Sequence, residues 1–288
     1  MPSACLPHWT TLAPEEIERQ FNPRASVPNA TDYFDRMAPH NRAAQAALVC
    51  RRDLPYGDHP LRRVDIYTPK NPGNTPAPVH LFIHGGYWRA LDKSDYAFIA
   101  QALCARGITT VLANYELCPG TTLDGVVDSA LAAFAWTCQN IRQYGGDPAR
   151  ISLSGHSAGA HLAAAVLSHD WSGVPGIPKA LASTTLISGV FDPEPAMHTS
   201  VNKDLHLTRE IAARNNLQAR VPTLAGPIAL FVGALEPPYW VDMTTRYAHT
   251  LRQAGLAPSV QVVPGCHHFD ITDQYLEAGS VIGRSIAY

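Results

Sequence analysis

The amino-acid sequence contains a motif that could supply a nucleophile. Residues 155–159 are Gly-His-Ser-Ala-Gly, which has the form Gly-x-Ser-x-Gly. In such a motif the serine occupies a tight turn between a strand and a helix, and its small neighbours allow the backbone to approach closely. The flanking residues fit this arrangement, because 151–154 are typical of a strand and 158–167 of a helix of small residues. We therefore predict that Ser157 is a nucleophile, with the Ala158 amide and the helix N-terminus beside the attacked carbonyl.

A second motif could stabilise the negative charge that such a reaction produces. Residues 84–88 are His-Gly-Gly-Tyr-Trp and follow directly on a predicted strand. A serine mechanism needs backbone amide donors for the oxyanion that forms. Two adjacent glycines let the chain turn and expose such amides, so we expect Gly86 or Tyr87 to supply one donor. Tyr87, Trp88 and His156 are predicted to contact the substrate, and core packing is the alternative for Trp88.

The base and the acid of a serine mechanism have candidates later in the chain. With a Gly-x-Ser-x-Gly elbow, the catalytic residues follow in the order serine, acid, histidine. His268 lies in the loop after the last predicted strand, which returns to the sheet edge that carries the serine. Glu236 follows the predicted strand 228–233, where its carboxylate could orient an imidazole. We expect Ser157, Glu236 and His268 to form a catalytic triad, with Asp192 as the alternative acid.

The chain around these motifs predicts a scaffold of the α/β class. From about residue 79 onward, short apolar runs alternate with helical patterns, which is typical of a mostly parallel sheet with crossover helices. The predicted strands of this sheet are 79–84, 108–115, 151–155, 184–190, 228–233 and 259–263. An antiparallel pair at 54–56 and 63–67 is expected at one edge. The predicted helices are 94–106, 127–141, 158–167 and 242–254.

Two segments depart from this alternation. Residues 1–45 form a predicted N-terminal arm, with one helix signal at 11–16 and then a loop rich in proline and asparagine. Residues 192–222 contain prolines and one short helical pattern, which predicts either a small cap segment over a site or a surface excursion. The chain of 288 residues is expected to form one domain, 1–288, because single α/β domains commonly reach this size.

The composition favours a small-molecule substrate over a polyanionic partner. Lys and Arg total 22 and Asp and Glu total 24, for a formal net charge of -2, so we expect neither nucleic-acid nor membrane binding. The six cysteines have no paired spacing and no HExxH motif occurs, so we expect no metal and no cofactor. The absence of a leader pattern makes the cytoplasm the expected location. A homodimer is left open.

The two motifs together carry a resemblance to a known family. Residues 84–88 and 155–159 resemble the HGGxW group of α/β-hydrolases, which contains arylformamidases (kynurenine formamidases) and related esterases. The similarity extends to Glu-Arg-Gln-Phe-Asn-Pro-Arg at 18–24, Asp-Lys at 92–93 and His-Phe-Asp at 268–270. It implies the α/β-hydrolase fold with a sheet of about eight strands, and a pocket that the arm and the region after the sixth strand help to enclose.

The resemblance also bears on single residues. In similar sequences the catalytic histidine precedes a phenylalanine, which corresponds to His268 and not to His267. Characterised formamidases often have aspartate at the position of Glu236. The resemblance therefore supports a triad more firmly than it supports formamidase activity.

These observations predict a serine hydrolase that acts through an acyl-enzyme on a carboxylic ester or on a small activated amide such as an aryl formamide. Kynurenine formamidase proper is one alternative, and a catalytically inactive ligand-binding protein on the same scaffold is an alternative of another class. We further expect a compact acyl group, an aromatic or flat apolar leaving group, and lower turnover for long-chain lipids.

Overall fold

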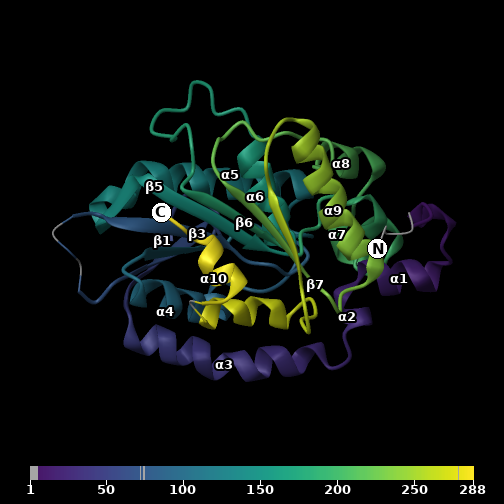
Figure 1. Ribbon diagram of the computed structural model, residues 1–288, viewed down its shortest axis with the longest axis horizontal. Coiled ribbons are helices and arrows are strands. Elements are labelled where there is room, and N and C mark those ends of the chain that lie inside the picture. The colour runs from purple at the N-terminus through teal and green to yellow at the C-terminus, as the bar shows by residue number, and fades with distance from the viewer. Residues whose placement is uncertain (1–5, 72, 74, 278) are drawn as a thin grey trace.

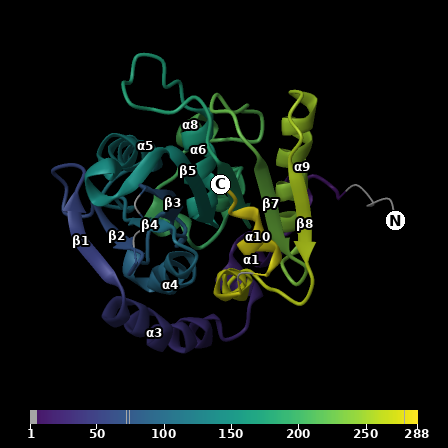
Figure 2. The same ribbon diagram turned by 60° about the vertical axis from the view of Figure 1, so that its left-hand side comes forward.

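The fold is built on one mixed sheet. The computed structural model describes residues 6–71, 73, 75–277 and 279–288. Its eight strands lie in the order β1-β2-β4-β3-β5-β6-β7-β8 (Figures 1 and 2). Their bounds are Val49–Pro55 (β1), Arg63–Thr68 (β2), Ala77–Ile83 (β3), Thr109–Ala113 (β4), Gly146–His156 (β5), Ser183–Ile187 (β6), Ile228–Gly233 (β7) and Ser259–Val263 (β8). Strand β2 is antiparallel to β1 and β4, and the strands from β4 to β8 are parallel. The predicted α/β class, parallel strands and antiparallel edge are confirmed.

Helices cover both faces of the sheet. Helices α5 (Leu123–Asn140), α6 (Ala158–Ser168) and α9 (Pro238–Gln253) lie on one face, and α3 (Ala30–Ala47), α4 (Ala97–Ala105) and α10 (Val281–Ser285) lie on the other (Figure 1). Strand β3 shows why the core divides in this way, because successive side chains point to opposite faces. Leu81 and Ile83 pack with α5 and α6, whereas Phe82 packs with α4. Near-continuous apolar runs are therefore required in the central strands.

The N-terminal arm differs from its prediction. Residues 1–5 of the predicted arm, with Cys5, lie outside the described residues. The rest contains α1 (Pro14–Phe21), α2 (Pro23–Ser26) and the long helix α3, where the sequence indicated a loop. Pro39 lies inside α3 and obscured the helical pattern. Packing stabilises the helix, because Tyr33 and Met37 are buried on one face of it. The local propensity was overridden by tertiary contacts.

The segment 192–222 consists of short helical elements, where the sequence indicated one short helix. It contains one 3-10 turn, Glu194–His198, and the helices α7 (Asn202–Leu205) and α8 (Arg209–Arg214). Helix α7 lies near α1, close to the described start of the chain (Figure 1). The hydroxyl and the amide of Ser200 both donate to the carboxylate of Glu18, each at 2.7 Å. The arm and this segment therefore hold each other although about 180 residues separate them.

Several histidines are buried within this scaffold. The ring of His80 on β3 lies between the hydroxyls of Ser152 and Ser154 on β5, at 2.6 Å from each. Burial lowers its pKa to about 3. Burial also lowers the pKa of His84 and of His161, each to about 4. These rings are neutral in the folded protein around neutral pH, because desolvation outweighs the groups that favour the charged form, such as Asp92 near His84.

The buried histidines predict a marked loss of stability in mild acid. In the unfolded chain a histidine has a pKa of about 6.5, so it binds a proton when the pH falls below that value. The same histidine, when buried in the folded protein, stays neutral until the pH reaches its lower pKa. Each buried histidine should lower the free energy of unfolding by about 1.4 kcal/mol for every pH unit below 6.5. Urea unfolding at several pH values between about 7.5 and 5 measures this slope.

The variant His80→Gln lacks one of these histidines, so the free energy of unfolding should change less steeply with pH. This effect does not depend on how the substitution changes stability at neutral pH. The exposed His249 provides the matched control, His249→Gln. An unchanged slope in His80→Gln would show that His80 does not stay neutral in the folded protein.

Candidate active site

Ser157 lies on a strained turn between β5 and α6. Its backbone has φ 57° and ψ -121°, a region that residues other than glycine rarely occupy. The amide of Ser157 donates to the carbonyl of Ile187 on β6 at 2.8 Å, which holds the turn in place. A Cβ atom on Gly159 would overlap the carbonyl oxygens of Ile83, the last residue of β3, and of His84, which follows it. The two glycines of the motif thus allow α6 to start against the sheet and to present the serine at its edge.

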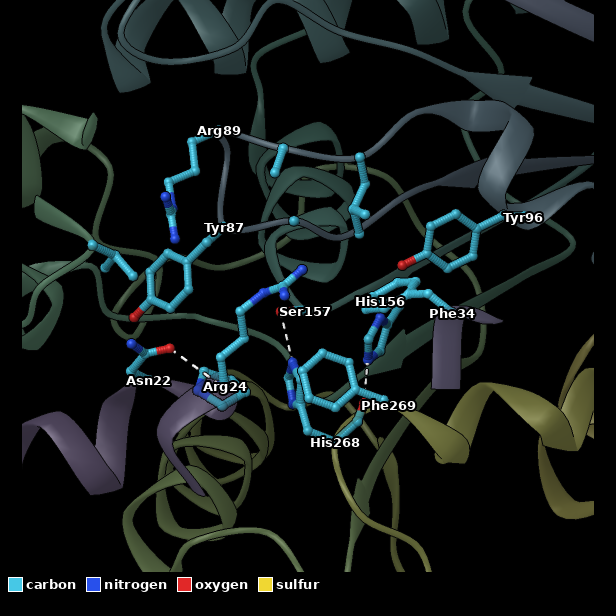
Figure 3. Close-up of a pocket in the computed structure, with 15 residues that line it drawn as sticks. Asn22, Arg24, Phe34, Tyr87, Arg89, Tyr96, His156, Ser157, His268 and Phe269 are labelled. Carbon is cyan, nitrogen blue, oxygen red and sulfur yellow. Dashed lines mark hydrogen bonds between the residues drawn. The ribbon is translucent and has the colours of Figure 1, made fainter. Parts of the chain in front are cut away.

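Three side chains form a hydrogen-bonded chain at the carboxyl ends of the parallel strands. The hydroxyl of Ser157 donates to Nε2 of His268 at 2.9 Å (Figure 3), and Nδ1 of His268 donates to Oε2 of Glu236 at 2.6 Å. His268 comes from the loop after β8, and Glu236 comes from the loop after β7. All three residues are buried. A neutral imidazole in this position can take the serine proton, while the carboxylate stabilises the imidazolium that results.

The loop after β3 presents backbone amides beside the serine. Gly86, Tyr87 and Trp88 all have positive φ, at 117°, 53° and 59°. Within the part of the chain that the structure covers, the amides of Gly86, Tyr87 and Ala158 donate to no protein acceptor. The hydroxyl of Tyr115 donates to the carbonyls of the two residues before Gly86, at 2.9 and 3.1 Å. This contact fixes a backbone that would otherwise relax from a strained conformation.

A pocket of about 500 Å³, counted with its open mouth, lies over Ser157. In the view of Figure 3 its two sides differ in character. Phe34, Tyr96 and Phe269 form an aromatic side, beside His156. Asn22 and Arg24 of the arm, with Tyr87 and Arg89, form a polar side. An aromatic wall and a cationic wall suit a ligand that combines a flat apolar group with a negative charge.

The two arginines of the pocket have different partners. Arg89 forms an ion pair with Asp204 of α7. The guanidinium of Arg24 lies 5.5 Å from the centre of the Phe34 ring, and no described carboxylate forms an ion pair with it. The Arg24 side chain is exposed at the mouth of the pocket. Arg24 therefore leaves its charge available to a ligand.

Most of the predicted site residues come together, and one does not. Ser157, Glu236, His268, Gly86, Tyr87, Ala158 and His156 all lie at the pocket or directly behind it. Trp88 does not line the pocket, which favours the alternative of core packing over a contact with substrate. Its ring is fully buried and packs edge-on against Tyr87 and His161, at 5.4 and 5.0 Å between ring centres. Tyr87 lines the cavity, whereas the neighbouring Trp88 is packed into the core.

The alternative acid, Asp192, serves a different purpose. Its carboxylate accepts from the side-chain amide of Asn216 at 2.9 Å and from the backbone amide of Glu194 at 3.1 Å. Burial raises the pKa of Asp192. This carboxylate organises the segment after β6, and Glu236 is the acid that contacts His268.

His156 contacts the loop that carries His268. Its Nε2 donates to the backbone carbonyl of His268 at 2.7 Å, and the two rings lie 4.8 Å apart between centres. Burial, together with the nearby His268, lowers the pKa of His156 well below the usual value. A neutral His156 adds no charge that would oppose protonation of His268.

The sequence reasoning did not find several pocket residues. Arg24 belongs to the arm motif at 18–24, so a signal for it was present. Phe34 and Tyr96 had no such signal, because aromatic side chains on helical patterns are more often part of the core. Ser188, whose hydroxyl contacts Glu236, stands in an apolar strand context that indicates nothing about its partner.

The described residues were also compared with the requirements of a metal site, a membrane-spanning helix and a disulfide. Among residues 6–71, 73, 75–277 and 279–288, no group of three or more His, Cys, Asp or Glu side chains is placed to hold a metal ion. No described helix is both long enough and apolar enough to cross a bilayer. The described cysteines, at 50, 104, 118, 138 and 266, are all free thiols.

Comparison with known proteins decides the family. Kynurenine formamidase of Danio rerio is 30% identical to this chain over 287 residues, which cover 96% of each chain. The chain belongs to the kynurenine formamidase family of α/β-hydrolases. It is a hydrolase of the ester- and amide-cleaving type. The predicted family, fold and serine-hydrolase function are confirmed.

Other similarities of this family member are narrower or structural. A family profile described as BD-FAE matches residues 64–171. A probable isoprenylcysteine alpha-carbonyl methylesterase of Arabidopsis thaliana is 39% identical over 117 residues, which cover 41% of this chain and 24% of that protein. A crystal structure from Silicibacter sp., described as a candidate thioesterase, superposes with a TM-score of 0.82 at 25% identity, covering 94% of this chain and 98% of the other.

The close approach of α6 to β3 predicts that Gly159 is sensitive to substitution. In Gly159→Ala the new methyl group must push helix and strand apart, which should lower the free energy of unfolding by about 1–3 kcal/mol and displace Ser157. Thermal unfolding and labelling by a fluorophosphonate measure the two effects. Gly279→Ala is the control, because a Cβ atom there meets nothing within 4 Å. Equal stability of the two variants would contradict the packing argument.

Proposed function

We propose that Ser157, His268 and Glu236 are the catalytic triad of an arylformamidase, and that N-formylkynurenine is its substrate. The hydrogen-bonded chain of these three side chains under an amide-lined pocket is the observation that carries the proposal. The similarity to a kynurenine formamidase over nearly the whole chain supports it. Glutamate in place of aspartate does not weaken the chemistry, because its Oε2 reaches Nδ1 of His268.

In the proposed reaction His268 takes the proton of Ser157 while Oγ forms a bond to the formyl carbon. The carbonyl oxygen becomes an oxyanion and accepts from the amides of Ala158 and of Gly86 or Tyr87. The carbon–nitrogen bond then breaks, and His268 gives its proton to the departing aryl amine. Water attacks the formyl-serine with His268 again as base, and formate leaves as Ser157 regains its proton.

The two sides of the pocket support the proposed substrate. Its aromatic amine fits against Phe34, Tyr96 and Phe269, and its carboxylate fits near the guanidinium of Arg24. The formyl group is the smallest acyl group, which suits the crowded space between Ser157 and the loop of Gly86. Within the single domain, we propose that the arm and the segment 192–222 act together as the cap, since the contact of Glu18 with Ser200 joins them beside the pocket residues Asn22 and Val201.

A substrate panel tests this function. It contains N-formylkynurenine, neutral formanilide and nitrophenyl esters of graded acyl length. We expect the highest kcat/KM for N-formylkynurenine and a steady fall from acetyl to decanoyl esters. If kcat/KM rises toward decanoyl and neither formamide is cleaved, the protein is a general esterase and the proposal fails.

The triad predicts a ranked loss of activity. Ser157→Ala and His268→Ala should each lower kcat by about 10⁴-fold or more, because the residues act as one unit, and Glu236→Gln should cost less, about 10²–10⁴-fold. Asp192→Asn and His267→Ala, which keep the chain of hydrogen bonds, serve as controls and should remain active. Steady-state kinetics and thermal unfolding separate lost chemistry from lost folding. A larger fall in kcat for Asp192→Asn than for Glu236→Gln would reverse the assignment of the acid.

The position of Arg24 predicts selective loss of the charged substrate. Arg24→Gln should raise KM for N-formylkynurenine by about tenfold, the value of one charge-assisted contact. The KM for neutral formanilide should stay the same, because it has no carboxylate. Arg42→Gln, at an exposed position of α3 away from the pocket lining, is the matched control. If Arg24→Gln changes both substrates equally, Arg24 has no role in binding the carboxylate.

A further inference from the structure

The carboxylate of Glu236 accepts hydrogen bonds from two donors besides His268. Its Oε2 accepts from His268, while its other oxygen, Oε1, accepts from the hydroxyl of Ser188 at 2.5 Å and from the backbone amide of Gly233 at 2.7 Å. The two donors lie at the carboxyl ends of two neighbouring strands, because Ser188 follows β6 directly and Gly233 is the last residue of β7. A buried carboxylate needs such donors to remain charged.

Ser188 is itself held rigidly. It is fully buried, and its backbone lies in the left-handed region with φ 51°. Its amide donates to the carbonyl of Phe231 at 2.7 Å, and its carbonyl accepts from the indole of Trp240 at 2.8 Å. A left-handed backbone is unfavourable for serine, so these contacts hold the residue in a conformation that it would not choose alone. The result is a hydroxyl that is aimed at Oε1 of Glu236.

We infer that Ser188 is a positioning residue, which acts through Glu236 to keep Oε2 directed at Nδ1 of His268. This inference rests on the proposed triad. A carboxylate group rotates easily about its last carbon–carbon bond, because that torsion is broad. With Oε1 held by two donors, the remaining lone pairs of Oε2 stay in line with the imidazole, which keeps the tautomer and orientation that a general base requires.

Few other charges act on the pair of Glu236 and His268. The ring of His156 lies against His268, and burial together with His268 lowers the pKa of His156 well below its usual value. Cys266 lies in the loop before His268, and burial raises the pKa of its thiol. The remaining titratable groups of this loop are His267, Asp270 and Asp273. None of these groups donates to Oε1, so the hydroxyl of Ser188 is the one side-chain donor that this oxygen has among the described residues.

The test compares Ser188→Ala with Ser188→Gly and with a control on the preceding strand, β6. Both Ser188 variants lose the hydroxyl, and glycine also accepts the positive φ, so at least one of them is expected to keep the fold. We expect kcat to fall about tenfold in both with KM within about twofold, since only the positioning of the base changes. Ser183→Ala removes a buried hydroxyl from the start of β6 that contacts Ala287, and should leave kcat unchanged.

The pH profile distinguishes positioning from general damage to the structure. Without the Ser188 hydroxyl the charged carboxylate is less stabilised, so the pair of Glu236 and His268 takes up a proton at higher pH, whichever residue holds it. The acid limb of kcat/KM should move to higher pH by about 0.5–1 unit. A lower kcat with an unmoved acid limb would overturn the inference.

A double-mutant cycle completes the test. Ser188→Ala should cost less than about twofold in a Glu236→Gln background, because its effect passes through the carboxylate. The same tenfold loss in both backgrounds would overturn the inference. If Ser157→Ala and Glu236→Gln keep full activity, the proposed function fails and the inference fails with it. If they are inactive while Ser188→Ala behaves like the unmodified protein, only the inference fails.

Discussion

The close approach of helix α6 to strand β3 is the constraint on which the rest of the site depends. Gly159 lies so near the carbonyls of Ile83 and His84 that a single methyl group does not fit. Helix α6 begins at Ala158, directly after β5, so the turn between strand and helix falls on Ser157. The backbone of Ser157 therefore adopts a strained conformation that surrounding contacts must maintain. The amide of Ser157 bonded to Ile187 supplies one of these contacts. Ser157 is therefore positioned by the sheet itself.

The parallel arrangement of the strands then brings the partners of the serine together. Loops after β3, β5, β7 and β8 all leave the same edge of the sheet, so groups far apart in the chain meet there. A buried carboxylate at this edge would be costly without donors, and Glu236 has three of them. Burial lowers the pKa of the neighbouring His156, so that ring adds no charge beside it. The buried part of the site thus contains one carboxylate with three protein donors, and the positive charge of Arg24 lies at the mouth of the pocket.

The pocket depends on contacts that join the N-terminal arm to distant parts of the chain. Asn22 and Arg24 of the arm form one wall, and the hydroxyl of Tyr87 donates to the carbonyl of Phe21 at 2.7 Å. The same segment is tied to the region after β6 through Glu18 and Ser200. The loop of Gly86 and Tyr87 is thus bonded to the arm that forms the polar wall of the pocket. In the proposed reaction this one stretch of backbone would connect the wall beside the leaving group with the amides beside the acyl group.

The amino-acid sequence by itself determined those features that depend on neighbouring residues. The turn around Ser157 is encoded by small residues within five positions, and the apolar runs predict the parallel strands, because burial on both faces leaves a local pattern. The order of Glu236 and His268 after the serine follows from the chain alone. Only the tertiary structure decided that α3 is a helix and that Trp88 packs into the core. It also decided that Arg24 lines the pocket and that Ser188 donates to Glu236. These features arise from contacts between distant segments, and such contacts leave no period in the sequence.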